Sequence, residues 1–421
     1  MRGFFSANNK VGQEFVFKTN SSSGTTFDPV VQMSGAKRAS WDLGEGGSYF
    51  AGNSVSYTYP NSSLKTVKLR TNRLTDVTSL NMPDDGIFGA LNLTGFTSCL
   101  GFLFNANTNL TGVTLPTTNL LVSSVRFGFC NLYGNLDLSV MPNFGGNFFI
   151  SQNPNLTGLT LPPSNTNNFT TFSLDQCNLY GRLDLSGFTG LGGQINLGYN
   201  TNITGITLPN SSQNITSFII GNSNFTHDLI ISGLTGMGGQ IQFDNVKSPN
   251  IIFPNSSNNI TFFSLNSCKS LGSVNLAPLS GMGGFISLQG NTGVTSYTLS
   301  KNSNPITYLG INTNLSLPTL DLTPFSGISN QVNLSSNSVL SNLILPTVYG
   351  GPVTIWSINE CSLPASGVNY VLYTIDNIGW TGGSLNISGG ANSAPNGSSG
   401  GYNGTASTLS LVSKGWSVTT N

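Results

Sequence analysis

A single histidine, five cysteines and a few carboxylates are the side chains of this chain that could do acid–base, nucleophilic or metal chemistry. Because His227 is the only histidine, no Ser/His/Asp or Cys/His catalytic arrangement can be built without it. His227 replaces the glycine found in two equivalent motifs at Gly134 and Gly181, so we expect it in an exposed turn. The sequence therefore predicts neither an enzyme nor a bound cofactor.

Two pairs of carboxylates have spacings that chemistry could use. Asp137 and Asp184 lie 47 residues apart at equivalent outward positions. Two repeats at the β-strand spacing place them roughly 9 to 10 Å apart, at the edge of the range for inverting glycosidases. No pocket is indicated, so solvated strand residues are the favoured interpretation. Asp84 and Asp85 follow Pro83 and predict a turn, with a calcium site as the alternative. The single histidine and the lack of a CxxC motif argue against any other metal site.

Four of the five cysteines belong to a ladder of thirteen positions. After an initial gap of 35 residues, every step along this ladder is 22 to 24 residues. The positions are Asn72, Asn107, Cys130, Asn153, Cys177, Asn200, Ser223, Asn245, Cys268, Asn291, Asn314, Asn337 and Cys361. Neighbouring cysteines are two repeats apart, roughly 9 to 10 Å, whereas a disulfide needs Cα atoms within about 7 Å. We therefore expect reduced, buried thiols that serve packing.

A period of this length predicts a solenoid of about thirteen coils of 23 residues. In the coil from Phe169 to Gly181, alternation along the strand predicts that Phe172 and Leu174 enter the core while Ser173 faces outward. The amide of each ladder asparagine can satisfy backbone groups of neighbouring coils. Gly-Gly pairs at 145–146, 192–193, 238–239 and 283–284 predict tight returns of the chain.

The segment Leu64–Leu74 reads L-x-x-L-x-L-x-x-N-x-L and resembles the leucine-rich repeat family. The resemblance extends over about 300 residues and implies a mainly β fold, a leucine-rich-repeat-like parallel β solenoid with N- and C-terminal caps. Coils that continue as x-L-x-G-x-L after the ladder residue resemble the two-sheet repeats of plant and bacterial leucine-rich repeat proteins.

Three segments follow from these patterns: 1–60, 61–364 and 365–421. The first resembles a PKD-like β-sandwich, because Trp41, Asp42 and Gly44–Gly46 match its turn and Val55, Tyr57 and Tyr59 match the element after it. We expect this segment to serve as a cap or an attachment. The last predicts an α/β C-terminal cap with a helix at Ala365–Gly379, a strand at 384–387, a second helix and a final strand. Its ending resembles terminal segments of leucine-rich-repeat-like virion and surface proteins of phages and Bacteroidota.

Composition narrows the partners. Charged residues make up 7% of the chain, against roughly 25% in typical soluble proteins, and the net charge is zero. Without a run of Lys or Arg, a nucleic acid partner is not expected. The sequence also shows no apolar run typical of a signal peptide and none long enough for membrane insertion.

One outward face of the middle coils combines neutral hydrogen-bonding groups with aromatic rings, which suits a carbohydrate ligand; the alternative is an ordinary solvated sheet. Its residues are Arg126, Phe129, Phe149, Gln152, Ser173, Asp175, Gln176, Asn196 and Tyr199.

Three functional hypotheses follow. The preferred one is a virion structural protein, such as a phage spike, fibre or tail component, exposed at the virion surface. It would contact other virion proteins or copies of itself, and a host-surface glycan or protein. The alternative is a bacterial cell-surface leucine-rich repeat adhesin. The third is a polysaccharide-degrading solenoid that uses Asp137 and Asp184.

Overall fold

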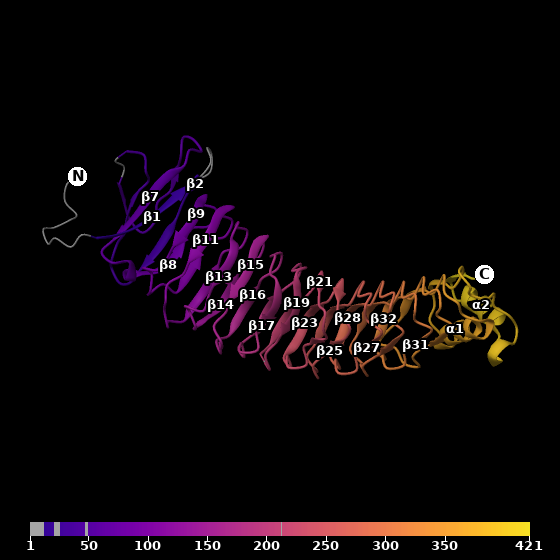
Figure 1. Cartoon of the computed structure of the whole chain (residues 1–421). Coiled ribbons are helices and arrows are strands. Elements are labelled where there is room, and N and C mark those ends of the chain that lie inside the picture. Colours follow the sequence, from indigo (N-terminus) through magenta and orange to yellow (C-terminus); the bar gives the residue numbers. More distant parts are fainter. Residues whose placement is uncertain (1–11, 21–25, 47–48, 212) are drawn as a thin grey trace. The chain divides into compact units, whose positions relative to one another are not determined.

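The structure, a computed structural model, describes residues 12–20, 26–46, 49–211 and 213–421 (Figure 1). It is mainly β and forms a parallel β solenoid with two α-helices in the described residues, so the predicted fold class is confirmed. The chain divides into two compact units. One comprises Met1–Tyr180 with Gly187–Asn200, and the other comprises Gly181–Ser186 with Thr201–Asn421.

The first unit contains two principal sheets. The N-terminal sheet has the strand order β11 (Asn109–Thr114), β9 (Ile87–Asn92), β1 (Gln13–Thr19), β7 (Lys65–Thr71), β4 (Ser40–Asp42) and β5 (Tyr49–Ala51). The main sheet runs through β3 (Val30–Met33), β8 (Val77–Asn81), β10 (Gly101–Leu103), β12 (Val122–Arg126), β14 (Phe144–Phe149), β16 (Phe169–Ser173) and β18 (Gly193–Asn196). Smaller elements are η1 (Leu74–Asp76) and the pairs β2 (Thr26–Phe27) with β6 (Tyr57–Thr58) and β13 (Tyr133–Asp137) with β15 (Asn155–Thr160).

The N-terminal segment closes both sheet edges of the first coil. Strand β1 pairs antiparallel with β9, and β3 pairs antiparallel with β8, so neither edge is left open. The segment Leu64–Leu74 is not the first coil, in contrast to the sequence prediction. Its strand β7 pairs antiparallel with β1 and β4. Its alternating Val67 and Leu69 face the core of the N-terminal segment.

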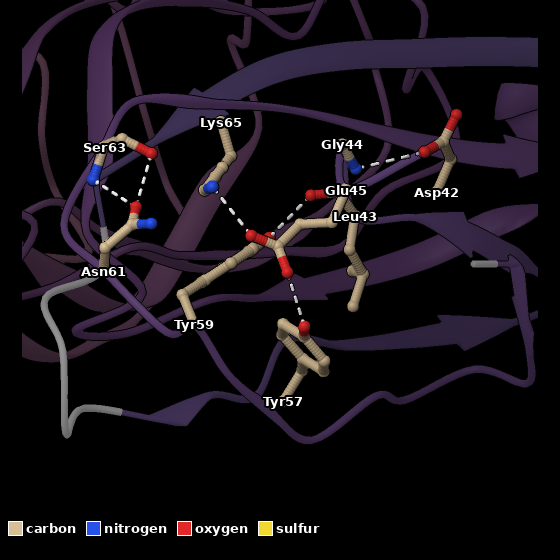
Figure 2. Close-up of polar contacts among 9 residues, drawn as sticks. All are labelled: Asp42, Leu43, Gly44, Glu45, Tyr57, Tyr59, Asn61, Ser63 and Lys65. Atoms are coloured by element: carbon tan, nitrogen blue, oxygen red, sulfur yellow. Dashed lines mark hydrogen bonds and ion pairs between the residues drawn. The ribbon is translucent and has the colours of Figure 1, made fainter. Parts of the chain in front are cut away.

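The turn that resembles the PKD motif is held by a group of polar contacts around Glu45 (Figure 2). Glu45 forms an ion pair with Lys65 at 2.7 Å and accepts a 2.5 Å hydrogen bond from the Tyr57 hydroxyl. The Tyr59 hydroxyl donates to the carbonyl of Leu43 at 3.1 Å (Figure 2). The hydrogen bonds from Lys65 and Tyr57 lower the pKa of Glu45, and the same carboxylate raises the pKa of Tyr57. These contacts tie the turn to the strands that follow it, which explains the motif as a structural staple.

The second unit carries the remaining coils. Its main sheet runs through β20 (Ile215–Ile219), β23 (Met237–Gln242), β26 (Ile260–Ser264), β28 (Met282–Ser287), β30 (Ile306–Gly310), β32 (Ile328–Asn333), β34 (Val353–Ser357), β35 (Gly383–Asn386) and β36 (Trp416–Thr419). The return strands pair as β17 (Gly181–Asp184) with β19 (Ile203–Thr207), β21 (Ser223–Asn224) with β24 (Val246–Lys247), β22 (Leu229–Ile230) with β25 (Ile251–Ile252), β27 (Ser273–Asn275) with β29 (Ser296–Thr298), and β31 (Thr319–Asp321) with β33 (Asn342–Ile344).

The C-terminal segment continues the main sheet of the second unit. Helix α1 (Ala365–Ile378) connects β34 to β35, and η2 (Ser399–Gly401) and α2 (Gly404–Ser413) lie between β35 and β36. Helix α1 ends at Gly379, which has φ 81°. Its buried face, Val368, Val371, Leu372 and Ile375, covers the end of the core. The segment therefore adds two parallel strands while its helices cover apolar surface.

Columns of apolar side chains build the core of each unit. In the first unit, Leu80, Phe102, Val125, Phe148, Phe172 and Ile195 are paired strand to strand and fully buried. In the second unit, the equivalent column includes Phe218, Ile241, Phe263, Ile286, Leu309, Val332 and Trp356. Burial of apolar surface coil against coil is the main source of stability in such a stack.

The glycine pairs do not form the returns that the sequence predicted. The second glycine of each pair lies at the start of a main-sheet strand in the left-handed region, as in Gly239 (φ 63°) and Gly284 (φ 60°). A Cβ at Gly284 would lie 2.1 Å from the carbonyl oxygen of Thr261 in the preceding coil. The strand pairing shifts register beside these glycines, as in a β-bulge. This bulge recurs in alternate coils and gives the repeat its superperiod.

The ladder positions form a buried polar column inside the coils. Asn107, Asn153 and Asn200 in the first unit, and Asn291, Asn314 and Asn337 in the second, are fully buried. Asn337 shows the pattern: its Nδ2 donates to the carbonyls of Ile311 (2.6 Å) and Leu334 (2.7 Å). Its Oδ1 accepts from the backbone N–H of Asn314 at 2.7 Å. Each amide thus bonds backbone groups of its own coil and of the preceding coil.

Two ladder assignments were wrong. Asn72 is exposed after β7, and the first ladder position is the fully buried Asp85, 22 residues before Asn107. Asn245 is also exposed, with φ 55°, and the inward position belongs to its neighbour Val246. The structure adds one position that the sequence pattern missed. Asn392 donates to the carbonyls of Ile358 and Ile387 and accepts from the N–H of Leu363.

A left-handed residue precedes each ladder position from Asp85 to Cys361 within its unit. Examples are Ala106, Phe129, Gln152 and Tyr199 in the first unit and Asn222, Thr313 and Glu360 in the second. This conformation turns the chain after the main-sheet strand. The residue one step later then points into the core, while the left-handed residue itself lies at the surface or near it.

The cysteines should be unreactive in the folded protein. All five are free and buried, and burial raises the pKa of Cys268 to about 12 and that of Cys361 to about 11. Because the thiolate is the reactive form, we expect no thiol to react with Ellman's reagent in native protein at pH 8. All five should react in denaturant. Rapid reaction of even one thiol in native protein would contradict their burial.

Candidate recognition surface

The outward face predicted from the sequence is partly assembled in the first unit. Arg126, Phe149, Ser173 and Asn196 occupy one column of the main sheet, each paired with the next. Phe129, Gln152, Gln176 and Tyr199 all occupy the left-handed position that precedes a ladder residue. Phe129 and Tyr199 are well exposed, at 45% and 58%.

An aromatic and cationic cluster forms at one end of this face. The Arg126 guanidinium carbon lies 5.9 Å from the centre of the Phe149 ring, and the Phe129 ring lies 5.9 Å from the same ring. The Phe149 ring lies across Gly128, where a Cβ would come within 2.0 Å of a ring atom. Arg126 Nε is buried without a hydrogen-bond partner. The contacts fix Phe149, which leaves Phe129 as the more accessible ring.

Ser173 and Asp175 are buried, so the expectation that they lie on the accessible face was wrong. The Ser173 hydroxyl donates to Asp175 Oδ1 at 2.8 Å, and the Ser151 hydroxyl lies 2.7 Å from Ser173 Oγ. Gln176 Nε2 donates to Asp175 Oδ2 at 3.3 Å. Both oxygens of this carboxylate are therefore occupied by neighbours within the fold.

A stack of aromatic rings in the second unit escaped the sequence analysis. Phe262, Phe285 and Tyr308 lie on adjacent strands, with ring centres 5.1 and 4.4 Å apart and planes within 8° of parallel. All three side chains are half-buried. Because the ring faces pack against one another, this stack serves the sheet itself. The signal in the sequence was an aromatic residue at the same position in three successive coils.

The candidate catalytic side chains occupy exposed turns or strand ends. Asp137 accepts from the N–H and hydroxyl of Ser139, and Asp184 accepts from the N–H of Ser186. The Ser186 N–H lowers the pKa of Asp184. His227 is exposed, as expected, and its Nδ1 lies 2.9 Å from the Thr226 hydroxyl. Each of these groups bonds locally to adjacent residues.

Asp85, one half of the alternative calcium pair, is fully buried while Asp84 is exposed. Its Oδ1 accepts from the N–H of Asp28 at 2.8 Å, and its Oδ2 is buried without a partner. Burial raises the pKa of Asp85 to about 8, and the negative charges of Asp28 and Asp84 act in the same direction. A neutral carboxyl therefore occupies a position where other coils carry an uncharged amide or thiol.

This burial predicts a pH-dependent stability. Below about pH 4, Asp85 is protonated in both the folded and the unfolded chain. Between about pH 4 and pH 8, only the unfolded chain loses the proton, so the free energy of unfolding falls by up to about 5 kcal/mol. Asp85→Asn should remove this decrease and stabilise the protein at pH 8. Denaturant unfolding of both proteins at pH 5 and pH 8 tests it. An unchanged pH dependence in the variant would contradict the assignment.

The second unit has one notable depression, of about 450 Å³, lined by Lys301, Asn302, Ser303, Thr323, Pro324 and Ser326. It is open to solvent and contains no acid–base pair. Within the described residues, no three His, Cys, Asp or Glu side chains are grouped so that they could hold a metal ion. No helix in the same residues is long and apolar enough to cross a membrane.

Exposed aromatic side chains are concentrated in the first unit. In the described part of the chain, the exposed aromatic residues are Phe88, Phe129, Tyr133, Tyr180, Tyr199 and Tyr373, and only Tyr373 belongs to the second unit. The most exposed are Tyr133 (66%) and Tyr180 (59%), which the sequence analysis did not select. Their signal was a motif, Cys-Asn-Leu-Tyr-Gly, that occurs twice, at 130–134 and 177–181.

Comparisons with known proteins add little to these observations. No protein-family model matches the chain, and no curated protein matches it either. Among solved structures, the chain is similar to the functional domain of InlJ from Listeria monocytogenes, which includes a cysteine ladder. The identity is 16%, the TM-score is 0.28, and the match covers 76% of each chain. The coils described above, and not this similarity, establish the fold of the chain as a parallel β solenoid.

Proposed function

We propose that this chain is a non-catalytic recognition protein displayed on a bacterial cell surface, where its first unit binds a surface glycan. The observation that carries the proposal is the concentration of exposed aromatic rings in that unit. Large aromatic groups that a fold leaves exposed, beside neutral amides, suit stacking on sugar rings and hydrogen bonding to hydroxyls.

The coils themselves support a binding role over a catalytic one. The polar groups inside them bond to one another along the ladder, and the candidate catalytic carboxylates bond to adjacent serines. We therefore expect no release of reducing sugar from any polysaccharide, and we expect Asp137→Asn and Asp184→Asn to behave as the unaltered chain.

Between the two placements considered, we propose the cell surface. No structural observation favours a virion component. A folded N-terminal segment in front of a stack of coils fits an adhesin, in which one part attaches and another part binds.

The binding proposal is tested with labelled, purified chain on an array of bacterial and host glycans. Binding that is lost after periodate oxidation of the glycans is the expected result. An absence of binding to every glycan, or release of soluble sugar by the chain, would contradict the proposal.

A further inference from the structure

We propose that Tyr133 and Tyr180 form a paired stacking site for an extended, neutral, β-1,4-linked glycan that runs along the coil axis of the first unit. This inference rests on the proposed function and assigns it a site. The two tyrosines lie outside the main-sheet face predicted from the sequence. Tyr133 opens the return strand β13, and Tyr180 lies at the equivalent point of the coil two steps further on.

The spacing of the two rings is set by backbone pairing. Tyr133 pairs with Asn155 across β13 and β15, and the N–H of Tyr180 donates to the carbonyl of Thr157 at 3.1 Å. The coil of Asn155 and Thr157 therefore separates the two tyrosines. Two coil steps correspond to roughly 9 to 10 Å. An extended β-1,4-linked chain can present two of its sugar rings to one side over about this reach.

Packing within the fold does not account for these rings. Tyr133 is 66% exposed and Tyr180 is 59% exposed, and neither makes a ring contact with another aromatic side chain. Gly134, immediately after Tyr133, has φ 73°, and a Cβ placed there would meet no atom within 4 Å. The surface beside Tyr133 is therefore open. This contrasts with Phe262, Phe285 and Tyr308, whose faces cover one another.

Neutral amides accompany the rings. Asn155 Nδ2 donates to Asn131 Oδ1 at 2.7 Å, and Asn178 Nδ2 lies 3.4 Å from the Tyr180 hydroxyl. The nearest carboxylate on β13, Asp137, is occupied by Ser139. Amides and phenol hydroxyls can both donate to and accept from sugar hydroxyls. This chemistry favours an uncharged glycan over an acidic one.

The test uses the full chain and three linear hexasaccharides, of β-1,4-linked glucose, mannose and N-acetylglucosamine, in calorimetric titrations. We expect at least one to bind. Tyr133→Ala and Tyr180→Ala should each weaken that binding by about five- to tenfold, since each removes one stacked ring. The corresponding Phe variants, which keep the ring, should stay within about threefold of the unaltered chain. Tyr373→Ala, at an exposed tyrosine of the second unit, is the matched control and should bind normally.

Circular dichroism melts establish that the variants are folded. If none of the three hexasaccharides binds, or if the Tyr133→Ala, Tyr180→Ala double variant binds as well as the unaltered chain, the site assignment is overturned. Binding to glycans on the array that survives in the double variant and disappears in Tyr199→Ala would overturn only the assignment. The proposed glycan-binding function would then stand, with its site on the main-sheet face.

Discussion

Replacing Asn337 with leucine is expected to destabilise the second unit by about 3 to 6 kcal/mol. The leucine would leave the carbonyls of Ile311 and Leu334 and the N–H of Asn314 without their side-chain partner. Each buried backbone group that loses its partner costs about 1 to 3 kcal/mol. The measurement is denaturant unfolding, with the free energy extrapolated to water.

Two controls separate the ladder from a general effect of the substitution. Asn342→Leu, at an exposed position five residues further on, should change the stability by less than about 0.5 kcal/mol. Asn337→Cys should have an intermediate effect, because the natural Cys361 thiol donates to the carbonyl of Leu334 at 3.3 Å but offers no good acceptor. Equal stability of Asn337→Leu and Asn342→Leu would show that the ladder amides do not hold the coils.

Replacing Gly284 with alanine is expected to cost more than about 3 kcal/mol. The new Cβ would lie 2.1 Å from the carbonyl oxygen of Thr261, and the backbone has φ 60°. To relieve this contact, β28 must move away from β26, which disturbs packing on both sides of the strand.

Gly379→Ala isolates the conformational part of this cost. Gly379 has φ 81°, and a Cβ there would meet nothing within 4 Å. We expect a loss of about 1 kcal/mol from the left-handed backbone alone. Thermal unfolding of both variants provides the comparison. If Gly284→Ala were no more harmful than Gly379→Ala, the close approach of the strands at the bulge would be disproved.

The repeat period predicted the solenoid, the inward columns and most of the ladder, because coils of constant length must superimpose. It failed where two positions satisfied the spacing equally well. Between Ser223 and Cys268, both Asn245 and Val246 keep the steps within 22 and 23 residues. The structure selects Val246 because the left-handed turn at Asn245 points the next side chain inward. The residues of the left-handed column share no chemical type, so the sequence gave no sign of it.

At the start of the solenoid, a strand imitated a coil. The alternation at Val67 and Leu69 is common to an antiparallel strand and a solenoid strand. The gap of 35 residues from Asn72 to Asn107 was the available warning, and Asp85 divides it at the regular step. An asparagine was expected at that position, and a buried carboxyl stands there.

For the candidate surface, alternation along the strand predicted direction but not coverage. Ser173 was expected to face outward, and hydrogen bonds through Ser151 and Asp175 bury it. Tyr133 and Tyr180 were overlooked because their motif lies on the return strand, where interest in the main sheet directed no search. Exposure depends on how neighbouring coils cover one another, and spacing alone does not contain it.

The proposal of a surface-displayed recognition protein is tested most directly by immunogold labelling of intact, unpermeabilised source cells with an antibody to this chain. Purified virus particles from the same culture are labelled in parallel. The proposal predicts gold on the cell envelope. Gold confined to virus particles, or seen only after the cells are permeabilised, would contradict it.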